Sequence, residues 1–204
     1  MLTPVAGSTE MESSTVSMSE VLNGRRSVRS FSPREVVPDD IQGMMEAARW
    51  SPSGGNRQPW RYILRVAGPA RAALGACLNR GNQWALAAPL LITQVTRLAD
   101  AGQSNGVPYA FFDSGLSVMC LIVEAETRGL RAHPMAGWNG EALMAELGIP
   151  SGYQPTVVMA VGHEGDPEAL DPATREKEAK PRVRRPLTSI LAYDRWSEHW
   201  SESP

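Results

Sequence analysis

Hydrophobic residues recur at helical spacing in the segment that begins "VPDDIQGMM". The apolar positions are Ile41, Met44, Met45 and Ala48. Their spacing of i, i+3, i+4 and i+7 places them on one face of a helix. Pro38 and the two acids after it suit a first helical turn. The pattern predicts an amphipathic helix that ends before Pro52.

A longer helix is predicted from Pro108 to Arg128. Its apolar positions fall on one side at Phe112, Leu116, Met119 and Val123 and on another at Phe111, Val118 and Ile122. A helix that is apolar around most of its circumference is expected to be buried. Asp113 is the only charged residue in its first part. Because acids favour the first turns of a helix, a structural role is preferred for it.

Short runs of β-branched and aliphatic residues predict strands at 61–66 and 89–95 and within 155–166. A helical segment is expected at 69–88, and shorter helices near 17–24 and within 139–150. Helices come first, and strands then alternate with helices, which predicts an α+β or mixed α/β fold. Residues 17–204 are assigned to one domain, and residues 1–16, rich in Ser, Thr, Gly and Glu, to a disordered tail.

Composition excludes several classes of protein. The chain has 204 residues, 42% apolar and 21% charged, with a formal net charge of −2, so neither a nucleic-acid partner nor a disordered chain is indicated. Apolar stretches fall short of the roughly 20 residues that cross a bilayer. Cys77 and Cys120 lack metal-ligand spacing, as do the histidines, so we expect no metal site. We expect both cysteines to be reduced core residues, which fits a cytoplasmic protein.

A basic cluster stands near the start of this nearly neutral chain. Arg25, Arg26, Ser27 and Arg29 lie in the stretch "RRSVR". Guanidinium groups and a hydroxyl suit one phosphate rather than a long polyanion. A solvated basic loop is the alternative interpretation.

Two further stretches combine residues of this kind. "SPSGGNRQPW", from Ser51 to Trp60, offers polar side chains and glycines that permit close backbone approach, although a polar turn has the same composition. "PRVRRPL" contributes Arg182, Arg184 and Arg185. These arginines either join the first cluster around one anion or protect an exposed terminal strand from edge pairing.

Taken together, these motifs resemble those of the nitroreductase family of FMN-dependent oxidoreductases, from about Val21 to Leu187. "RRSVR" matches a family motif of the type R-R-S-x-R/K, and the stretch from Ser51 matches A/S-P-S-x-x-N-x-Q-P-W. The stretches "EAETRGL", "HPMAGW", "LGIP", "AVGH" and "RRPL" follow in the family's order.

The resemblance implies a nitroreductase-like fold with a central, mainly antiparallel sheet flanked by helices. It also implies an intertwined homodimer with FMN at the subunit interface. Arg25, Arg26 and Ser27 would bind the FMN phosphate with Arg184, helped by Arg182 or Arg185, and Arg29 would face the flavin pyrimidine. The partner subunit would supply Ser53, Gly54 and Asn56. The flavin near N5 would be lined by Pro134, Met135, Ala136 and Gly137.

The activity implied by the resemblance is ping-pong hydride transfer from NAD(P)H through FMN to a nitroaromatic, quinone or related acceptor. No catalytic side chain is assigned, because the flavin carries the redox chemistry. The turn "HPMAGW" lacks the Glu-Gly pair of some family members, and the segment before the long helix is short. These departures leave open dehalogenation, flavin fragmentation and ring oxidation, and also a non-catalytic FMN-binding or storage protein.

Overall fold

The computed structural model describes residues 17–66 and 68–197, so the expected tail at 1–16 lies outside the described residues. Its helices are α1 Met18–Gly24, α2 Pro38–Arg49, α3 Pro69–Ala76, α4 Ala110–Thr127, α5 Gly140–Leu147 and α6 Pro172–Glu178. Its strands are β1 Trp60–Arg65, β2 Leu90–Arg97, β3 Gln103–Ser104, β4 Val107–Pro108, β5 Arg131–Met135 and β6 Tyr153–Gly162. Short 3-10 helices include Gly54–Asn56 and Arg80–Ala87.

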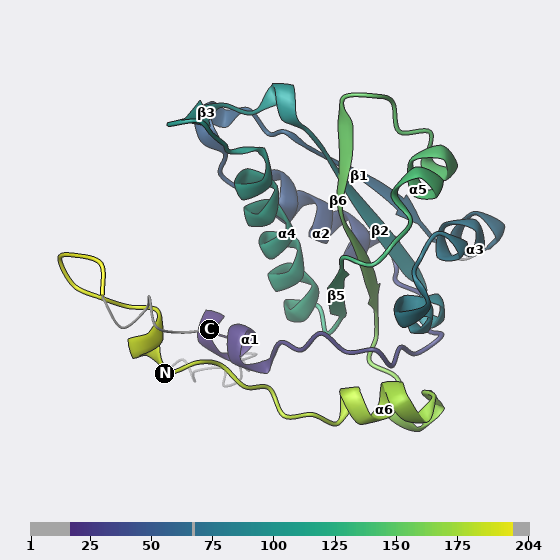
Figure 1. The fold of residues 1–204 in the computed structure, drawn as a ribbon. Coiled ribbons are helices and arrows are strands. Elements are labelled where there is room, and N and C mark those ends of the chain that lie inside the picture. Colours follow the sequence, from purple (N-terminus) through teal and green to yellow (C-terminus); the bar gives the residue numbers. More distant parts are fainter. Residues whose placement is uncertain (1–16, 67, 198–204) are drawn as a thin grey trace, which may run out of the picture.

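The central sheet has the strand order β1-β2-β6-β5, and every neighbouring pair is antiparallel (Figure 1). In its middle, Leu91 lies opposite Ala160 and Ile92 opposite Met159. Successive side chains of a strand point to opposite faces, and both faces of this sheet are buried. The strand β2 is accordingly buried along nearly its whole length and β6 along its second half, and the predicted α+β fold with an antiparallel sheet is confirmed.

Helices cover both faces of the sheet (Figure 1). On one face, Met44 of α2 and Leu121 of α4 share a buried cluster with Ile92 and Met159. On the other face, α3 and α5 pack over Leu91, and Val28 and Phe31 join that second cluster. Because Val28 and Phe31 belong to the core, the loop that carries the first arginines is anchored to the sheet. The site described below is thus built on a packed scaffold.

The helix α4 differs from its prediction along one side. Its inner side buries Leu121, Ile122 and Ala125, as expected. Phe111 and Phe112, however, are 45% and 60% exposed, and Met119 is 37% exposed. The expectation of a fully buried helix is therefore wrong for the described chain, which leaves an apolar strip on α4 uncovered.

Two local predictions are corrected by the structure, and two elements were not predicted. The segment 69–88 is not one helix, because α3 ends at Ala76 and a 3-10 helix begins at Arg80. Pro134 and Met135, expected in a turn, lie in β5. Proline is tolerated there because β5 is an edge strand of the sheet. The helix α6 and the β3–β4 hairpin were not predicted.

The expectation of reduced core cysteines is confirmed only in part. Cys77 and Cys120 are both free thiols, but Cys120 is only half-buried. Among residues 17–66 and 68–197, the helices are too short or too polar to span a lipid bilayer.

Candidate functional site

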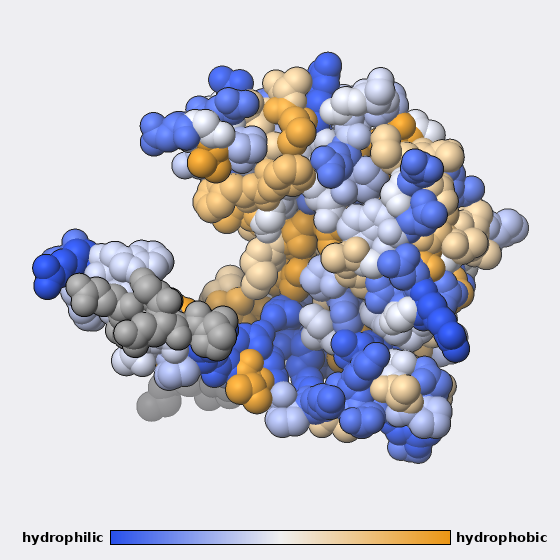
Figure 2. Space-filling model, in the orientation of Figure 1, coloured by the Kyte–Doolittle hydropathy of each residue, from blue (hydrophilic) through white to orange (hydrophobic). Residues whose placement is uncertain are grey.

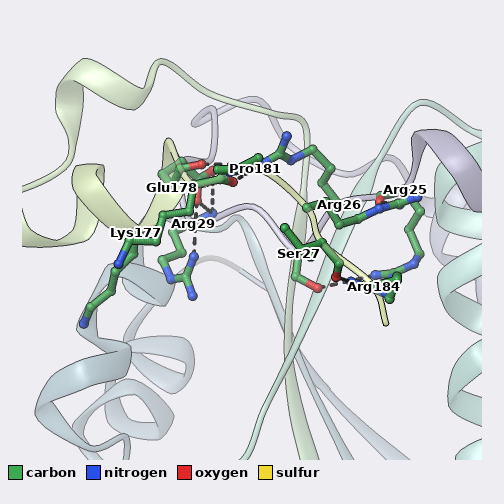
Figure 3. Close-up of a pocket in the computed structure, with 11 residues that line it drawn as sticks. Arg25, Arg26, Ser27, Arg29, Lys177, Glu178, Pro181 and Arg184 are labelled. Carbon is green, nitrogen blue, oxygen red and sulfur yellow. Dashed lines mark hydrogen bonds and ion pairs between the residues drawn. The ribbon is translucent and has the colours of Figure 1, made fainter. Parts of the chain in front are cut away.

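The two arginine clusters meet although more than 150 residues separate them. They line a cavity of about 320 Å³ between the loop after α1 and the segment after α6 (Figure 3). Its lining residues are Arg25, Arg26, Ser27, Arg29, Lys177, Glu178, Lys180, Pro181, Arg182, Val183 and Arg184. Seven of these eleven side chains are basic, and one is acidic. The interpretation as two unrelated basic surface segments is therefore excluded.

The loop with the first cluster is shaped by alternating burial. Val28 and Ser30 are buried at 2% exposure each, so the residues between and before them turn toward the surface. At the end of the loop, the N–H of Ser32 donates to the carbonyl of His163 at 2.9 Å, and the N–H of Gly165 donates to the carbonyl of Ser30 at 3.0 Å. The segment directly after β6 thus holds the loop in place.

Some of the arginines fasten the two segments together rather than standing free. Arg26 donates from Nη2 to the carbonyl of Lys180 at 3.0 Å. Arg182 donates from Nη1 to the carbonyls of Leu22, at 3.1 Å, and of Arg25. In these hydrogen bonds, guanidinium donors of Arg26 and Arg182 are already bound to backbone oxygens. The role of both arginines is therefore at least partly structural.

Arg25, Ser27 and Arg184 group at one end of the cavity, as Figure 3 shows. Arg25 donates to Ser27 Oγ at 3.4 Å, and Arg184 donates to the carbonyl of its neighbour Val183 at 2.8 Å. Neither arginine forms an ion pair with an acidic side chain of the described residues. This end therefore carries two guanidinium groups without ion-pair partners in the described chain, beside a hydroxyl, which is the chemistry that a phosphate requires.

The other end of the cavity is organised around Arg29. The backbone N–H of Arg29 donates to both carboxylate oxygens of Glu178 at 3.0 Å, and its guanidinium Nη1 lies 3.5 Å from Glu178 Oε2. The same guanidinium lies 5.9 Å from the centre of the Trp84 ring. Trp84 lies outside the sequence motifs, so no pattern in the sequence pointed to it.

His133 lies next to this end and is fixed by a short hydrogen bond. Its Nδ1 lies 2.7 Å from the carbonyl of Val28, and its ring centre lies 4.5 Å from that of Trp84. A carbonyl can only accept, so Nδ1 carries the proton and donates. Burial lowers the pKa of His133, and the charges of Arg29 and Arg25 lower it further, against the raising effects of the Val28 bond and of Glu178. His133 therefore has a local hydrogen-bonding role that ties β5 to the arginine loop.

A buried acid lies close behind the first cluster. The side chain of Glu126, near the end of α4, is 4% exposed and pairs with Arg131. Burial raises the pKa of this carboxyl, whereas Arg131, the charge of Arg25 and the backbone N–H of Arg26 lower it. Its charge interacts electrostatically with that of Arg25, although the two side chains do not form an ion pair.

The motif from Ser51 lies at the opposite end of α4. The N–H of Gly54 donates to Asp113 at 3.2 Å, and the N–H of Gln58 donates to Ser53 Oγ at 3.0 Å. Asp113 and Glu126 are thirteen residues apart on one helix, which corresponds to about 20 Å along its axis. One chain therefore does not bring Ser53, Gly54 and Asn56 to its own arginine cavity.

The turn after β5 leaves the sheet at Ala136. The side chain of Met135 is buried in the core, so a ligand could meet only its backbone. The carbonyl of Gly137 accepts from the backbone N–H of Asn79 at 3.1 Å and from Asn82 Nδ2 at 3.0 Å. A Cβ on Gly137 would lie 2.7 Å from Asn82 Nδ2, so a larger residue there would displace the Asn82 side chain. Asn79 and Asn82 therefore fix the turn at Gly137, and the asparagines of "LNRGN" were their only sequence signal.

The arginine cavity unites six of the residues nominated from the sequence: Arg25, Arg26, Ser27, Arg29, Arg182 and Arg184. Arg185 is not among the residues that line it. Ser53, Gly54, Asn56 and the stretch from Pro134 to Gly137 also lie outside its lining.

Comparison with known proteins gives consistent results. The model of the nitroreductase family matches residues 22–76 and 65–163. An uncharacterized 15.4 kDa protein of Mycolicibacterium smegmatis is 40% identical over 124 residues, which cover 60% of this chain and 82% of that protein. An NADH dehydrogenase of Thermus thermophilus is 28% identical over 202 residues, covering 83% of this chain and 92% of the relative.

A solved structure supports the same assignment. The crystal structure of an oxidoreductase containing FMN superposes with a TM-score of 0.80 at 26% identity, covering 95% of this chain and 99% of that one. The family match spans well over half of the chain and includes both the loop from Arg25 and the loop from Ser51. The chain belongs to the nitroreductase family.

Proposed function

We propose that this protein is an FMN-dependent oxidoreductase that oxidises NADH or NADPH and reduces a nitroaromatic, quinone or related acceptor. The observation that carries the proposal is the cavity end formed by Arg25, Ser27 and Arg184. Its guanidinium groups lack acidic partners among the described residues, and the motif that supplies them is the one that resembles the family's phosphate-binding motif. The names of the FMN-containing structure and of the NADH dehydrogenase support the same cofactor and donor.

In this proposal the protein binds and orients the cofactor. Arg25 and Arg184 hold the phosphate of FMN through charge-assisted hydrogen bonds, and Ser27 adds a hydroxyl donor. Arg29 stands at the pyrimidine end, and the turn from Pro134 to Gly137 borders the reactive edge of the ring. Bound FMN supplies the hydride-transfer chemistry of the reaction. No side chain is assigned as a nucleophile or general base.

We further propose that the protein acts as an intertwined homodimer. Figure 2 shows a hollow between the helix α4 and the C-terminal segment, with apolar surface along it. The side chains of Phe112, Leu187 and Ile190 are 60%, 65% and 67% exposed. Large exposed apolar surfaces mark interaction sites. A second copy would cover this surface and bring Ser53, Gly54 and Asn56 of the partner subunit to the cofactor.

The visible absorption spectrum of the purified protein tests the proposal directly. A yellow protein that releases FMN on denaturation is expected, and failure to bind added FMN would reject the proposal. Oxidation of NADH and NADPH with a nitroaromatic or a quinone as acceptor then tests the activity. Light scattering after gel filtration tests the dimer, for which twice the chain mass of 22.1 kDa is expected. Cytoplasmic location, where NAD(P)H is supplied, belongs to the same proposal.

A further inference from the structure

The arginine cavity contains an acidic side chain, which is unexpected in a site that binds an anion. Glu178 is the single acidic side chain among its lining residues, against seven arginines and lysines. Figure 3 shows it beside Arg29, at the end of the cavity opposite Arg25 and Arg184. The cavity is therefore divided into an end whose arginines have no ion-pair partner among the described residues and an end where a carboxylate pairs with the arginine.

Glu178 is held at this end by several contacts. Both of its carboxylate oxygens accept the N–H of Arg29 at 3.0 Å, and Ser30 Oγ donates to Oε1 at 3.4 Å. The guanidinium of Arg29 completes the set at 3.5 Å. The side chain of Glu178 is 11% exposed and that of Arg29 is 27% exposed. An ion pair shielded to this degree retains more of its electrostatic effect than one in open water.

The position of Glu178 in its own helix does not explain these contacts. It is the last residue of α6, where the helix dipole disfavours a negative charge. The start of α6 is stabilised separately, because the side chain of Asp171 accepts from the N–H groups of Ala173 and Thr174. Glu178 thus acts through its contacts with Arg29 and Ser30 rather than as a local stabiliser of α6.

We propose that Glu178 is a positioning residue that holds Arg29 and offsets its charge, and thereby lowers the reduction potential of bound FMN. This inference rests on the proposed function. Reduced flavin carries more electron density at its pyrimidine end than oxidised flavin, so a cation there favours the reduced cofactor. A carboxylate paired with that cation weakens the preference. Glu178 therefore makes bound reduced FMN a stronger electron donor to the acceptor.

The test compares charge-removing variants of two acids of α6 in the full-length, FMN-loaded protein. Glu178→Gln keeps the shape and one acceptor for the N–H of Arg29. Glu176→Gln is the matched control, because it makes the same charge change two residues earlier at a side chain that is 78% exposed. The midpoint potential is measured by spectroelectrochemical titration. Glu178→Gln is expected to tighten binding of reduced relative to oxidised FMN about tenfold, which for two electrons is about 30 mV more positive.

The control variant is expected to leave the potential at the wild-type value. A shift in Glu178→Gln no larger than that in Glu176→Gln, or a shift to more negative potential, overturns the inference. Should Glu178→Gln not load FMN, Arg29→Gln is compared with the double variant Arg29→Gln/Glu178→Gln, which leaves no unpaired charge. The double variant is expected to have the more positive potential, and equal potentials overturn the inference. Wild-type protein that binds no FMN rejects the proposed function itself, whereas FMN binding with unshifted potentials rejects only the role of Glu178.

Discussion

The backbone N–H of Gly54 donates to the carboxylate of Asp113, at 3.3 Å from Oδ1 and 3.2 Å from Oδ2. This bond joins the loop after α2 to the first turn of α4, and the Asp113 side chain is buried at 1% exposure. The structural role preferred for Asp113 is thereby confirmed. The loop that carries Ser53, Gly54 and Asn56 is held in place by an acid fifty-nine residues further along the chain.

Replacement of Asp113 tests this anchor. Asp113→Ala leaves the N–H of Gly54 without its acceptor, and the expected loss in the free energy of unfolding is about 1 to 3 kcal/mol. Asp113→Asn retains an acceptor oxygen and should lose less. Denaturant titration of both variants measures the difference. Equal losses would show that the negative charge, and not the hydrogen bond, is what the site requires.

Arg184 and Arg185 form a natural pair for testing phosphate binding, because only the first lines the cavity. Arg184→Ala is expected to weaken FMN binding about tenfold to a hundredfold, as expected for the loss of a hydrogen bond to a charged group. Riboflavin, which lacks the phosphate, should bind Arg184→Ala and Arg185→Ala as tightly as it binds the wild type. Fluorescence titration gives each dissociation constant. A comparable loss of FMN affinity in Arg185→Ala would argue against the assigned position of the phosphate.

Arg29→Ala is predicted to lower the midpoint potential of bound FMN. The variant removes the cation at the proposed pyrimidine end and leaves Glu178 without its ion-pair partner. Both changes disfavour the reduced cofactor. The measurement is a potential titration of protein that still contains FMN. An unchanged potential in that loaded variant would remove Arg29 from its proposed role.

The lowered pKa of His133 makes stability depend on pH. Burial depresses the pKa in the folded state below the usual value of 6.5, so the unfolded chain binds the proton more tightly. The contribution of His133 to stability is fully present above pH 6.5 and is lost as the pH falls through the folded-state pKa. Chemical denaturation between pH 5 and pH 8 is expected to show this decline on the acid side. In His133→Gln the decline should be smaller, and an unaltered pH profile would assign it to other groups.

Gly165 provides a test of the contact between the segment after β6 and the arginine loop. A Cβ at this position would overlap the backbone carbonyl group of Phe31, which cannot move as a side chain could. Gly165→Ala is therefore expected to reduce the free energy of unfolding by about 1 to 3 kcal/mol through overpacking. Gly140→Ala is the control, since nothing lies within 4 Å of its added Cβ. Thermal unfolding of the two variants compares them, and similar melting temperatures would contradict the close approach.

Helical periodicity and apolar runs were sufficient to predict α2, α4, β1, β2 and β6, because each buries an apolar face that the residue pattern records. The same signal could not reveal α6, whose sequence "PATREKE" has no buried residue. It also missed β5, where Pro134 argues against a strand unless that strand lies at an edge. Strand order is a property of the sheet and cannot be read from one segment.

The local chemistry of the site is present in the linear chain: the motif from Arg25, the motif from Ser51 and the terminal arginines are each continuous stretches. The relative placement of these stretches cannot be read from the linear chain, because it depends on which buried residues pack together. Val28 and Phe31 enter the core and fix the first loop, and Arg182 bonds back to Leu22 across the cavity. The pairing of Glu178 with Arg29 joins residues 149 positions apart. Opposite charges attract wherever the fold brings them together, whatever their separation in the sequence. The fold therefore decides which arginines pair with an acid and which remain free to bind a ligand.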